Sequence, residues 1–237
     1  MSLYQQILTC KTKGVKLLAI LLDPDKLVVE NLSNLILKIN QSPATHIFIG
    51  GSSFDGNHLD ELIIQLKAQI NLPFLLFPGN PSQISKDADG ILFLTLLSGR
   101  NPDYLIEHQV NAVPIIKKTN LEVISTGYIL IESGNETAVE RVSKTKPLDR
   151  NNHEYALQTA QAGELIGNKL IYLEAGSGAK LSVPEEMITL VAQNIKVPLI
   201  VGGGIRSKQE IENAYDAGAD LVVIGTAFEN DVNFFNS

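Results

Sequence analysis

The sequence predicts an α/β fold, a (β/α)8 barrel built as a single domain over residues 1–237, and three observations carry that prediction. Short apolar runs alternate with amphipathic stretches, which is the pattern of parallel strands connected by helices. Eight such runs are present, and 237 residues suit one barrel of this type. Trp is absent and aromatic residues are only 6% of the chain, so Ile, Leu, Val and Ala must form the core, as in buried parallel strands.

The predicted strands are mostly continuous apolar runs, which favours a sheet covered on both faces. In chain order they span residues 15–23, 46–50, 74–77, 90–94, 113–117, 169–174, 198–203 and 220–225. Between them, apolar residues three and four positions apart predict helices at 27–41, 59–70, 102–110, 153–167, 185–195 and 208–218. Ser207 and Glu210 have the spacing of a capping box at the start of the last helix.

Two intervals depart from this alternation. Residues 78–89 contain two prolines in their first four positions and leave little room for a crossover helix, so we expect the third helix to be degenerate or missing. Residues 121–134 are rich in β-branched residues and are predicted to form an extended addition after the fifth strand. A short helix is expected at 135–142, and an exposed loop at 143–152.

Composition excludes several functional classes. A formal net charge of −7 without any Lys/Arg run argues against a nucleic-acid partner. The single Cys10 cannot form an internal disulfide, which agrees with a reducing compartment, and the cytoplasm is the expected location. The longest apolar run, residues 17–22, is far below the roughly 20 residues that span a bilayer, and the N-terminus lacks the pattern of a signal peptide.

Glycine clusters follow the last two predicted strands, at residues 202–204 and at Gly225 with Thr226. Glycine lets the backbone approach a phosphate closely, and barrels often bind phosphate with the loops after strands seven and eight. Either cluster alone is explained equally well by the steric needs of a turn. Both clusters together, after these two strands, favour phosphate binding.

Acidic and hydroxyl side chains follow other predicted strands. Asp23 closes the first strand, where it would face the mouth of the barrel, and a carboxylate is a suitable Mg²⁺ ligand beside substrate phosphates. The alternative is a helix-capping role, which we expect for Asp25 rather than Asp23. Ser52, after the second strand, could contribute a hydroxyl to the mouth or serve as a simple cap.

The sixth strand ends in a phenol, a carboxylate and a glycine-rich loop. Strand alternation places Tyr172 and Glu174 on one face, which could be the barrel interior. A buried carboxylate there could accept a hydrogen bond from a substrate hydroxyl or act as a general base. A barrel-filling Tyr and a solvated Glu are the alternative, but the glycines that follow favour a functional site.

Six motifs, in order along nearly the whole chain, resemble those of the geranylgeranylglyceryl phosphate synthases: DPDK (23–26), GGS (50–52), LSGRNP (97–102), YLEAGSGA (172–179), VGGGIRS (201–207) and GTAFE (225–229). The resemblance implies a barrel that lacks its third helix. It also implies a prenyltransferase that joins the C3 hydroxyl of sn-glycerol 1-phosphate to a polyprenyl diphosphate such as geranylgeranyl diphosphate. Diphosphate is released with the help of Mg²⁺, and an ether lipid precursor is formed.

The same resemblance implies roles for individual residues. Asp23 and Ser52 would be the magnesium ligands, and Asp23, Tyr172 and Glu174 the catalytic residues. The glycerol moiety and its phosphate would be bound by Tyr172, Leu173, Glu174, Ala175, Gly176, Ser177, Gly178, Gly203, Gly204, Gly225 and Thr226. The family further implies a homo-oligomer, either a dimer or a hexamer, and a peripheral membrane contact for product release is a related expectation.

The chain departs from part of this family at one position. Some members carry a Lys two residues before the first-strand aspartate, where this chain has Leu21, and the longer AGSG loop points to the second subgroup. Arg206 and Lys180 are then the candidates for neutralising the phosphate. Residues 91–97 are a candidate wall of the prenyl groove. Another phosphate-handling barrel, such as a sugar-phosphate isomerase, cyclase or synthase, and a non-catalytic phosphate-binding barrel are the alternative functions.

Overall fold

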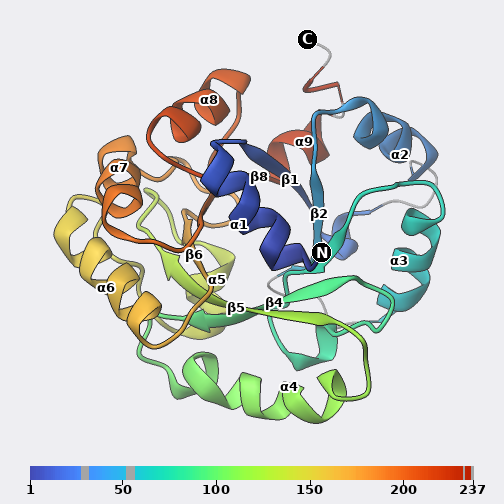
Figure 1. Ribbon diagram of the computed structural model, residues 1–237, viewed down its shortest axis with the longest axis horizontal. Coiled ribbons are helices and arrows are strands. Elements are labelled where there is room, and N and C mark those ends of the chain that lie inside the picture. The colour runs from blue at the N-terminus through green and yellow to red at the C-terminus, as the bar shows by residue number, and fades with distance from the viewer. Residues whose placement is uncertain (28–31, 52–56, 232, 236–237) are drawn as a thin grey trace.

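Eight parallel strands close into a barrel in chain order, with β8 paired back onto β1. The structure is a computed structural model that describes residues 1–27, 32–51, 57–231 and 233–235. Its strands are β1 (Leu17–Leu22), β2 (His46–Ile49), β3 (Phe74–Leu76), β4 (Gly90–Leu96), β5 (Glu122–Leu130), β6 (Leu170–Glu174), β7 (Leu199–Gly202) and β8 (Leu221–Ile224). Helices surround the barrel (Figure 1), so the predicted (β/α)8 fold is confirmed.

Helices follow most of the strands at the predicted positions, apart from residues 28–31 of the first one, which lie outside the described residues. Ser207 Oγ accepts a hydrogen bond from the Glu210 amide at 3.2 Å and caps its helix as expected. The elements between and after the strands are η1 (Pro24–Lys26), α2 (Leu32–Gln41), α3 (Leu59–Lys67), η3 (Pro81–Gln83), η4 (Asp103–Glu107), α4 (His108–Ile116), α5 (Ala138–Ser143), α6 (His153–Leu165), α7 (Glu185–Asn194), α8 (Lys208–Asp216) and α9 (Thr226–Asn230).

The third crossover helix is missing, as the prolines of residues 78–89 predicted. Between β3 and β4 the chain forms only the single turn η3, which Asn80 caps by accepting a hydrogen bond from the Ser82 amide at 2.9 Å. A proline inside the first turn and a three-residue span leave no room for a helix that could cover the neighbouring strands. An apolar cavity lies here, and among the described residues β4, η4, α4 and the segment around η3 form most of its walls.

The prediction of the fifth strand was wrong. Residues 113–117 end helix α4, which contains Pro114, and β5 is formed by the segment predicted to be an addition. A short run of four apolar residues, from Val113 to Ile116, cannot distinguish a short strand from the end of a helix. The β-branched content of 122–130 was the better indicator, because this segment pairs with β4 over seven residues from Gly90↔Glu122 to Leu96↔Tyr128.

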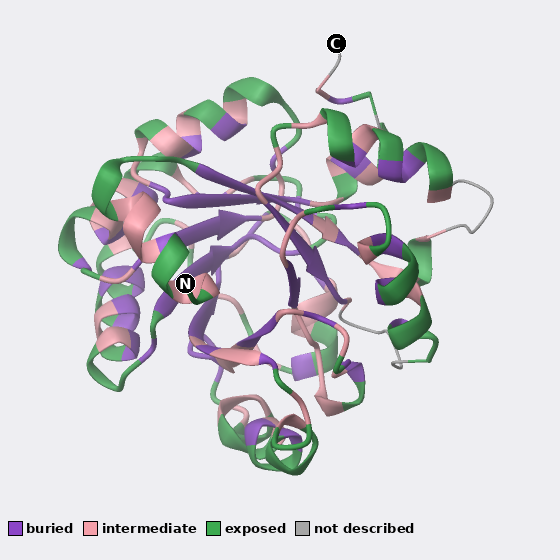
Figure 2. Ribbon diagram, turned by 45° about the vertical axis from the view of Figure 1, so that its right-hand side comes forward, coloured by how far each residue is buried: buried purple, intermediate pink, exposed green. Residues whose placement is uncertain are grey.

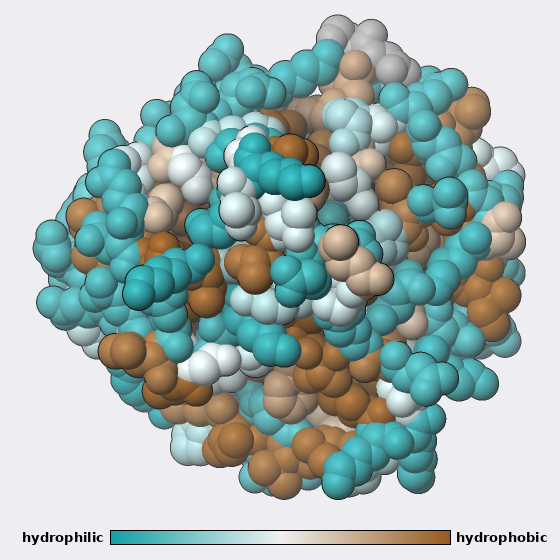
Figure 3. Space-filling model, in the orientation of Figure 1, coloured by the Kyte–Doolittle hydropathy of each residue, from teal (hydrophilic) through white to brown (hydrophobic). Residues whose placement is uncertain are grey.

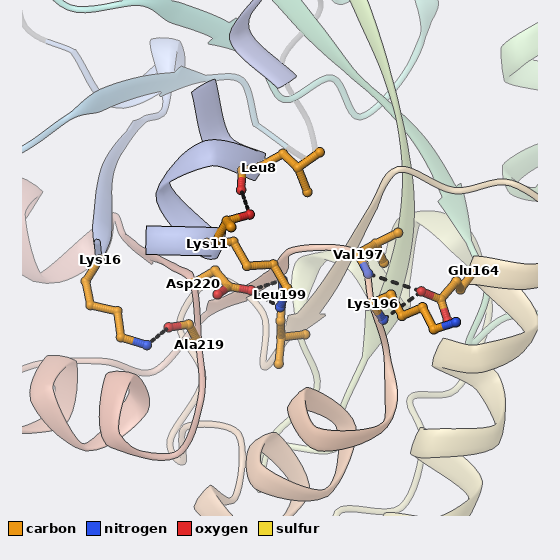
Figure 4. Close-up of polar contacts among 10 residues, drawn as sticks. Leu8, Lys11, Lys16, Glu164, Lys196, Val197, Leu199, Ala219 and Asp220 are labelled. Atoms are coloured by element: carbon orange, nitrogen blue, oxygen red, sulfur yellow. Dashed lines mark hydrogen bonds and ion pairs between the residues drawn. The ribbon is translucent and has the colours of Figure 1, made fainter. Parts of the chain in front are cut away.

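A helix that was not predicted, α1 (Leu3–Lys13), crosses one end of the barrel (Figure 1). Its Ile7 is fully buried in the inner core, and its first amides, including that of Tyr4 at 2.9 Å, donate to the Glu122 carboxylate. Figure 4 shows Asp220 accepting from Lys11 Nζ at 2.9 Å and from the Leu199 amide at 2.8 Å. Helix α1 thus closes the amino-terminal end of the barrel and leaves the opposite end for a site.

Two apolar layers result from strand alternation, one inside the barrel and one between the strands and the helices. The strands are almost entirely buried (Figure 2). In β6, Tyr172 belongs to the inner layer and Leu173 to the outer one. Within the described part of the chain, none of the helices combines the length and the apolar character needed to cross a membrane.

Candidate active site

A cavity of about 410 Å³ opens at the carboxyl ends of the strands. Segments after seven of the eight strands, all except β4, contribute to it, and the carboxyl ends of the strands are where barrel enzymes hold their catalytic groups. Most of the predicted site residues line this cavity, namely Asp23, Tyr172, Glu174, Gly176, Ser177, Gly178, Gly203, Gly204, Gly225 and Thr226. Residues separated by up to about two hundred positions in sequence are thereby brought to one place.

Glu174 is a buried carboxylate on the inner face of β6, with only 5% of its surface exposed. Burial raises its pKa from 4.5 to about 6, while the Tyr172 hydroxyl and the Gly176 amide favour its charged form and limit the rise. The Gly176 N–H donates to Glu174 Oε1 at 2.7 Å. The carboxylate is therefore oriented by the loop that follows it and can take up a proton near neutral pH.

Tyr172 lies beside Glu174 on the same face of β6, as strand alternation predicted. Burial, together with the nearby charge of Glu174, raises the pKa of Tyr172 well above 10, so the phenol stays neutral. Its hydroxyl is close enough to Glu174 to favour the carboxylate, yet forms no hydrogen bond of normal geometry within the described residues. A buried donor of this kind is available to a ligand in the cavity.

The loop after β7 passes so close to Glu174 that only glycine fits. A Cβ at Gly203 would lie 2.3 Å from Glu174 Oε1, and Gly203 and Gly204 both have left-handed backbone with φ of +79° and +72°. A Cβ at Gly204 would lie 2.9 Å from the carbonyl of Leu181. The glycines therefore bring backbone, rather than side chains, to the wall of the cavity beside the carboxylate.

Asp23 forms a charged cluster with Lys26 and Glu229 at the other side of the cavity. Lys26 Nζ lies 3.4 Å from Asp23 Oδ2 and 3.0 Å from Glu229 Oε2, and the Asp23 amide donates to Glu229 Oε1 at 3.3 Å. Burial disfavours the ammonium group, but Glu229 and then Asp23 outweigh it, and the pKa of Lys26 is raised. Two carboxylates thus converge on one cation at the cavity wall.

Asp23 also caps the turn η1, because its Oδ1 accepts a hydrogen bond from the Asp25 amide at 3.2 Å. The capping role expected for Asp25 therefore belongs to Asp23. This role uses Oδ1, whereas Oδ2 faces Lys26, so capping and a role in the cavity are compatible.

A second cavity, of about 110 Å³, adjoins the first on the side of the missing third helix. Its lining is almost entirely apolar and comes from β4, from the segment after β3 and from the inner face of η4 and α4. The predicted groove wall contributes Ile91, Leu92, Phe93, Leu94 and Leu96. A polar cavity and an apolar cavity therefore meet at the mouth of the barrel.

Residues 11–236 match the sequence profile of the PcrB family. The chain is 69% identical over 236 residues to the geranylgeranylglyceryl phosphate synthase of Flavobacterium johnsoniae, covering 100% of this chain and 97% of that relative. It is 42% identical over 221 residues to the geranylgeranylglyceryl phosphate synthase of Pyrococcus furiosus, with 93% and 87% covered. The chain belongs to the PcrB family, that of the geranylgeranylglyceryl phosphate synthases.

The fold of this chain also resembles that of a solved structure from the same family. The crystal structure of (S)-3-O-geranylgeranylglyceryl phosphate synthase from Thermoplasma acidophilum in complex with substrate sn-glycerol-1-phosphate superposes with a TM-score of 0.92 at 33% identity. The superposition covers 100% of this chain and 95% of that one. The resemblance drawn from the six motifs is confirmed.

Three residues carried over from the family stand apart from the others. Leu173 packs in the outer apolar layer, between the strands and the helices. Ala175 is fully buried in that same layer, and its amide donates to the Gly202 carbonyl at 3.0 Å. Ser52 lies outside the described residues, but its neighbour Gly51 lines the cavity, and a Cβ there would lie 2.5 Å from Asp23 Oδ1.

The two candidates for neutralising a phosphate differ in placement. Arg206 lines the polar cavity and donates to the backbone carbonyls of Lys180, at 3.0 Å, and Ala179. Lys180 does not line it. Lys26 and Glu229 were not among the site residues predicted from the sequence, although both lie within motifs that carried the resemblance, DPDK and GTAFE. Their charges become informative only when the ends of β1 and β8 are seen to lie side by side.

Proposed function

We propose that this chain is a prenyltransferase that joins the C3 hydroxyl of sn-glycerol 1-phosphate to a polyprenyl diphosphate, releasing diphosphate. The observation that carries the proposal is the meeting of a polar cavity, which holds a buried carboxylate, with an apolar cavity at the mouth of the barrel. The names of the relatives, and the sn-glycerol-1-phosphate bound by the Thermoplasma acidophilum enzyme, support the choice of reaction.

In this proposal sn-glycerol 1-phosphate occupies the polar cavity. Its phosphate lies against the backbone of Gly203, Gly204, Gly225 and Thr226, while its hydroxyls reach Glu174 and Tyr172. Loops after strands seven and eight are the usual phosphate site of barrels. Arg206 and Lys26, which line the same cavity, supply positive charge.

Glu174 then accepts the proton of the C3 hydroxyl as that oxygen attacks the prenyl carbon. With a pKa of about 6, the group is mostly ionised at neutral pH and still basic enough to take up a proton. The Gly176 amide and the backbone of Gly203 hold the carboxylate in place, so the hydroxyl can be aligned with little reorganisation.

Mg²⁺ is proposed as the cofactor, with Asp23 and Ser52 as its ligands. Carboxylate oxygens are suitable ligands for this ion, and Asp23 and Glu229 bring two of them together at the cavity wall. Both carboxylates already pair with the positive charge of Lys26, so this part of the site accommodates a cation. A bound Mg²⁺ would stabilise the negative charge on departing diphosphate as a Lewis acid. Lys26 occupies the space between the two carboxylates and would be available to contact the diphosphate itself.

The prenyl chain is proposed to enter the apolar cavity. Burial of hydrocarbon contributes roughly 0.8 kcal/mol per CH₂, so a groove without polar partners can hold a long chain. The missing third helix leaves the inner side of α4 and the segment 78–81 as walls of this space.

The direct test supplies the purified protein with sn-glycerol 1-phosphate, geranylgeranyl diphosphate and Mg²⁺, and identifies the extracted product by mass spectrometry. A prenylglyceryl phosphate whose formation stops when EDTA is added would support both the reaction and the metal. No product with any prenyl chain would overturn the proposed reaction. Turnover of a sugar phosphate instead would establish the alternative, another phosphate-handling barrel.

The titration of Glu174 predicts the acid limb of the pH profile. Because the carboxylate is the active form, kcat/KM for sn-glycerol 1-phosphate should fall about tenfold per pH unit below its pKa of about 6. In Glu174→Gln, the residual activity should no longer fall as the pH drops below 6. A limb that stays near pH 6 in the variant would show that another group is responsible.

Filling the apolar cavity should discriminate between prenyl chains. Ala112 is buried on the inner side of α4 and lines this cavity. Ala112→Phe should raise KM for geranylgeranyl diphosphate about tenfold or more, since each excluded CH₂ forfeits roughly 0.8 kcal/mol, without changing KM for sn-glycerol 1-phosphate. The control is Leu165→Phe, at a position that is 86% exposed and belongs to neither cavity. Equal effects of the two variants would contradict this placement.

Two further expectations remain predictions, namely self-association and a cytoplasmic location. Apolar side chains gather at the lower edge of Figure 3, where α4 lies in Figure 1. The exposed apolar residues of η4 and α4 include Ile106, Val110 and Val113. If light scattering shows a dimer or hexamer, substitutions on this surface are the first test of where the subunits meet.

A further inference from the structure

The two cavities share a small set of lining residues. Among the described residues these are Gly51, Phe77, Tyr128 and Val139, and two of the four are aromatic. If the glycerol phosphate occupies the polar cavity and the prenyl tail the apolar one, the carbon that forms the new bond must lie where the cavities meet. Phe77 and Tyr128 are therefore next to the reacting atoms.

These rings belong to a compact aromatic cluster. The ring centroid of Phe77 lies 5.9 Å from that of Tyr128 and 5.5 Å from that of Tyr172, on which it stacks at 28°. Tyr128 and Tyr172 pack edge to face at 5.4 Å. Both phenols are buried, with Tyr172 beside Glu174. Each ring is thus held by two others, and the cluster ends at the carboxylate that would receive the proton.

We propose that the rings of Phe77 and Tyr128 stabilise the positive charge that develops on the allylic carbon of the prenyl diphosphate. This inference rests on the proposed function and adds catalytic residues to it. The bond between the prenyl C1 and the diphosphate oxygen breaks with its electron pair going to the diphosphate. The C3 oxygen of glycerol phosphate forms the new bond to C1, and its proton passes to Glu174. A cation at C1 is attracted to the electron-rich face of an aromatic ring.

The charges around the junction fit this role. The described lining of the apolar cavity contains no Lys or Arg, so no ammonium or guanidinium group there would repel a positive carbon. The basic side chains Lys26 and Arg206 line only the polar cavity, where phosphate and diphosphate need them. The ring faces can thus stabilise the carbon, and the Tyr128 phenol stays neutral and weakly nucleophilic because burial, with the charge of Glu174, raises its pKa well above 10.

A neighbouring ring distinguishes this role from simple packing. Phe48 is fully buried, its centroid lies 6.4 Å from that of Phe77, and it lines neither cavity. If the rings matter only as filling material, Phe48 and Phe77 should respond alike to a change in ring electronics. If the charge of the reacting carbon matters, only Phe77 should respond.

The experiment replaces Phe77 with mono-, di- and trifluorophenylalanine, which progressively weaken the negative ring face at nearly constant shape. We expect kcat for geranylgeranyl transfer to fall stepwise with each fluorine, to about 30-fold in total, which corresponds to about 2 kcal/mol for a desolvated cation–π contact. KM for sn-glycerol 1-phosphate should stay constant. The same series at Phe48 should leave kcat unchanged.

The outcomes separate this inference from the proposed function. A wild-type protein that forms no prenylglyceryl phosphate would overturn both. A wild-type protein that forms product, with kcat equal or rising along the Phe77 series, would overturn the aromatic role and leave the proposed function standing. Parallel decreases at Phe77 and Phe48 would indicate packing and would also overturn it. Phe77→Leu, which keeps an apolar side chain without a ring, should reproduce the loss of the trifluoro variant.

Discussion

Glu174→Gln should lower kcat for prenyl transfer by about 10²–10⁴-fold, the range that a positioned general base contributes. Gln has nearly the same shape, so the packing around Gly203 is retained, but it cannot accept the proton of the C3 hydroxyl. Steady-state kinetics with both substrates varied is the measurement.

The two substrates should respond differently to this change. Glu174 lines only the polar cavity, so the apparent affinity for sn-glycerol 1-phosphate should weaken while that for geranylgeranyl diphosphate is nearly unchanged. A matched control is Glu210→Gln, which alters an acidic residue at the start of α8 outside both cavities. Equal loss of affinity for both substrates would contradict the assigned role.

The same substitution should stabilise the protein at high pH. The pKa of Glu174 is raised on folding from 4.5 to about 6, so the folded state favours the protonated form. The resulting stabilisation is fully present below pH 4.5 and is lost as the pH rises through 6. Ionising the buried group then costs on the order of 2 kcal/mol. Thermal unfolding should show the gain of Glu174→Gln at pH 8 and little gain at pH 4.

Asp23→Asn should reduce turnover by about 10³-fold, since a metal ion supplies several kcal/mol of transition-state stabilisation. Asn keeps the side-chain oxygen that caps η1 and removes only the charge, so the fold should be retained. Asp23→Ala should lose the same activity and in addition about 1 kcal/mol of stability, because the cap is removed. Kinetics and denaturant unfolding of the two variants measure these effects.

Metal binding gives a readout that does not depend on turnover. Titration with Mn²⁺, followed by electron paramagnetic resonance in the presence of inorganic diphosphate, should show binding to the wild type and at least tenfold weaker binding to Asp23→Asn. Asp25→Ala is the control, because Asp25 lies in the same turn but lines neither cavity, and its backbone amide remains. Unchanged Mn²⁺ affinity in Asp23→Asn would remove Asp23 from the metal site.

The sequence by itself determined the elements whose signals are local. Continuous apolar runs identify seven of the eight strands, because a strand that is buried on both faces is apolar along its whole length. The prolines of 78–89 exclude the third helix through backbone geometry alone. Strand alternation is also local, and it correctly placed Tyr172 and Glu174 on the inner face and at the mouth.

Only the tertiary structure decided features that depend on contacts between distant segments. Residues 113–117 are apolar enough for a strand, but their place is taken by 122–130, which pairs along seven residues of β4, and this preference is a property of the sheet. The burial that raises the pKa of Glu174 comes from the closed barrel and from the loops after β6 and β7. The Lys26–Glu229 pair spans 203 positions, and Phe77, Tyr128 and Tyr172 come from three different strands or strand ends. Motifs therefore identify the chemistry of the family, whereas closure of the barrel sets the charge, the proton affinity and the meeting point of the two cavities, because these depend on distances between atoms far apart in the chain.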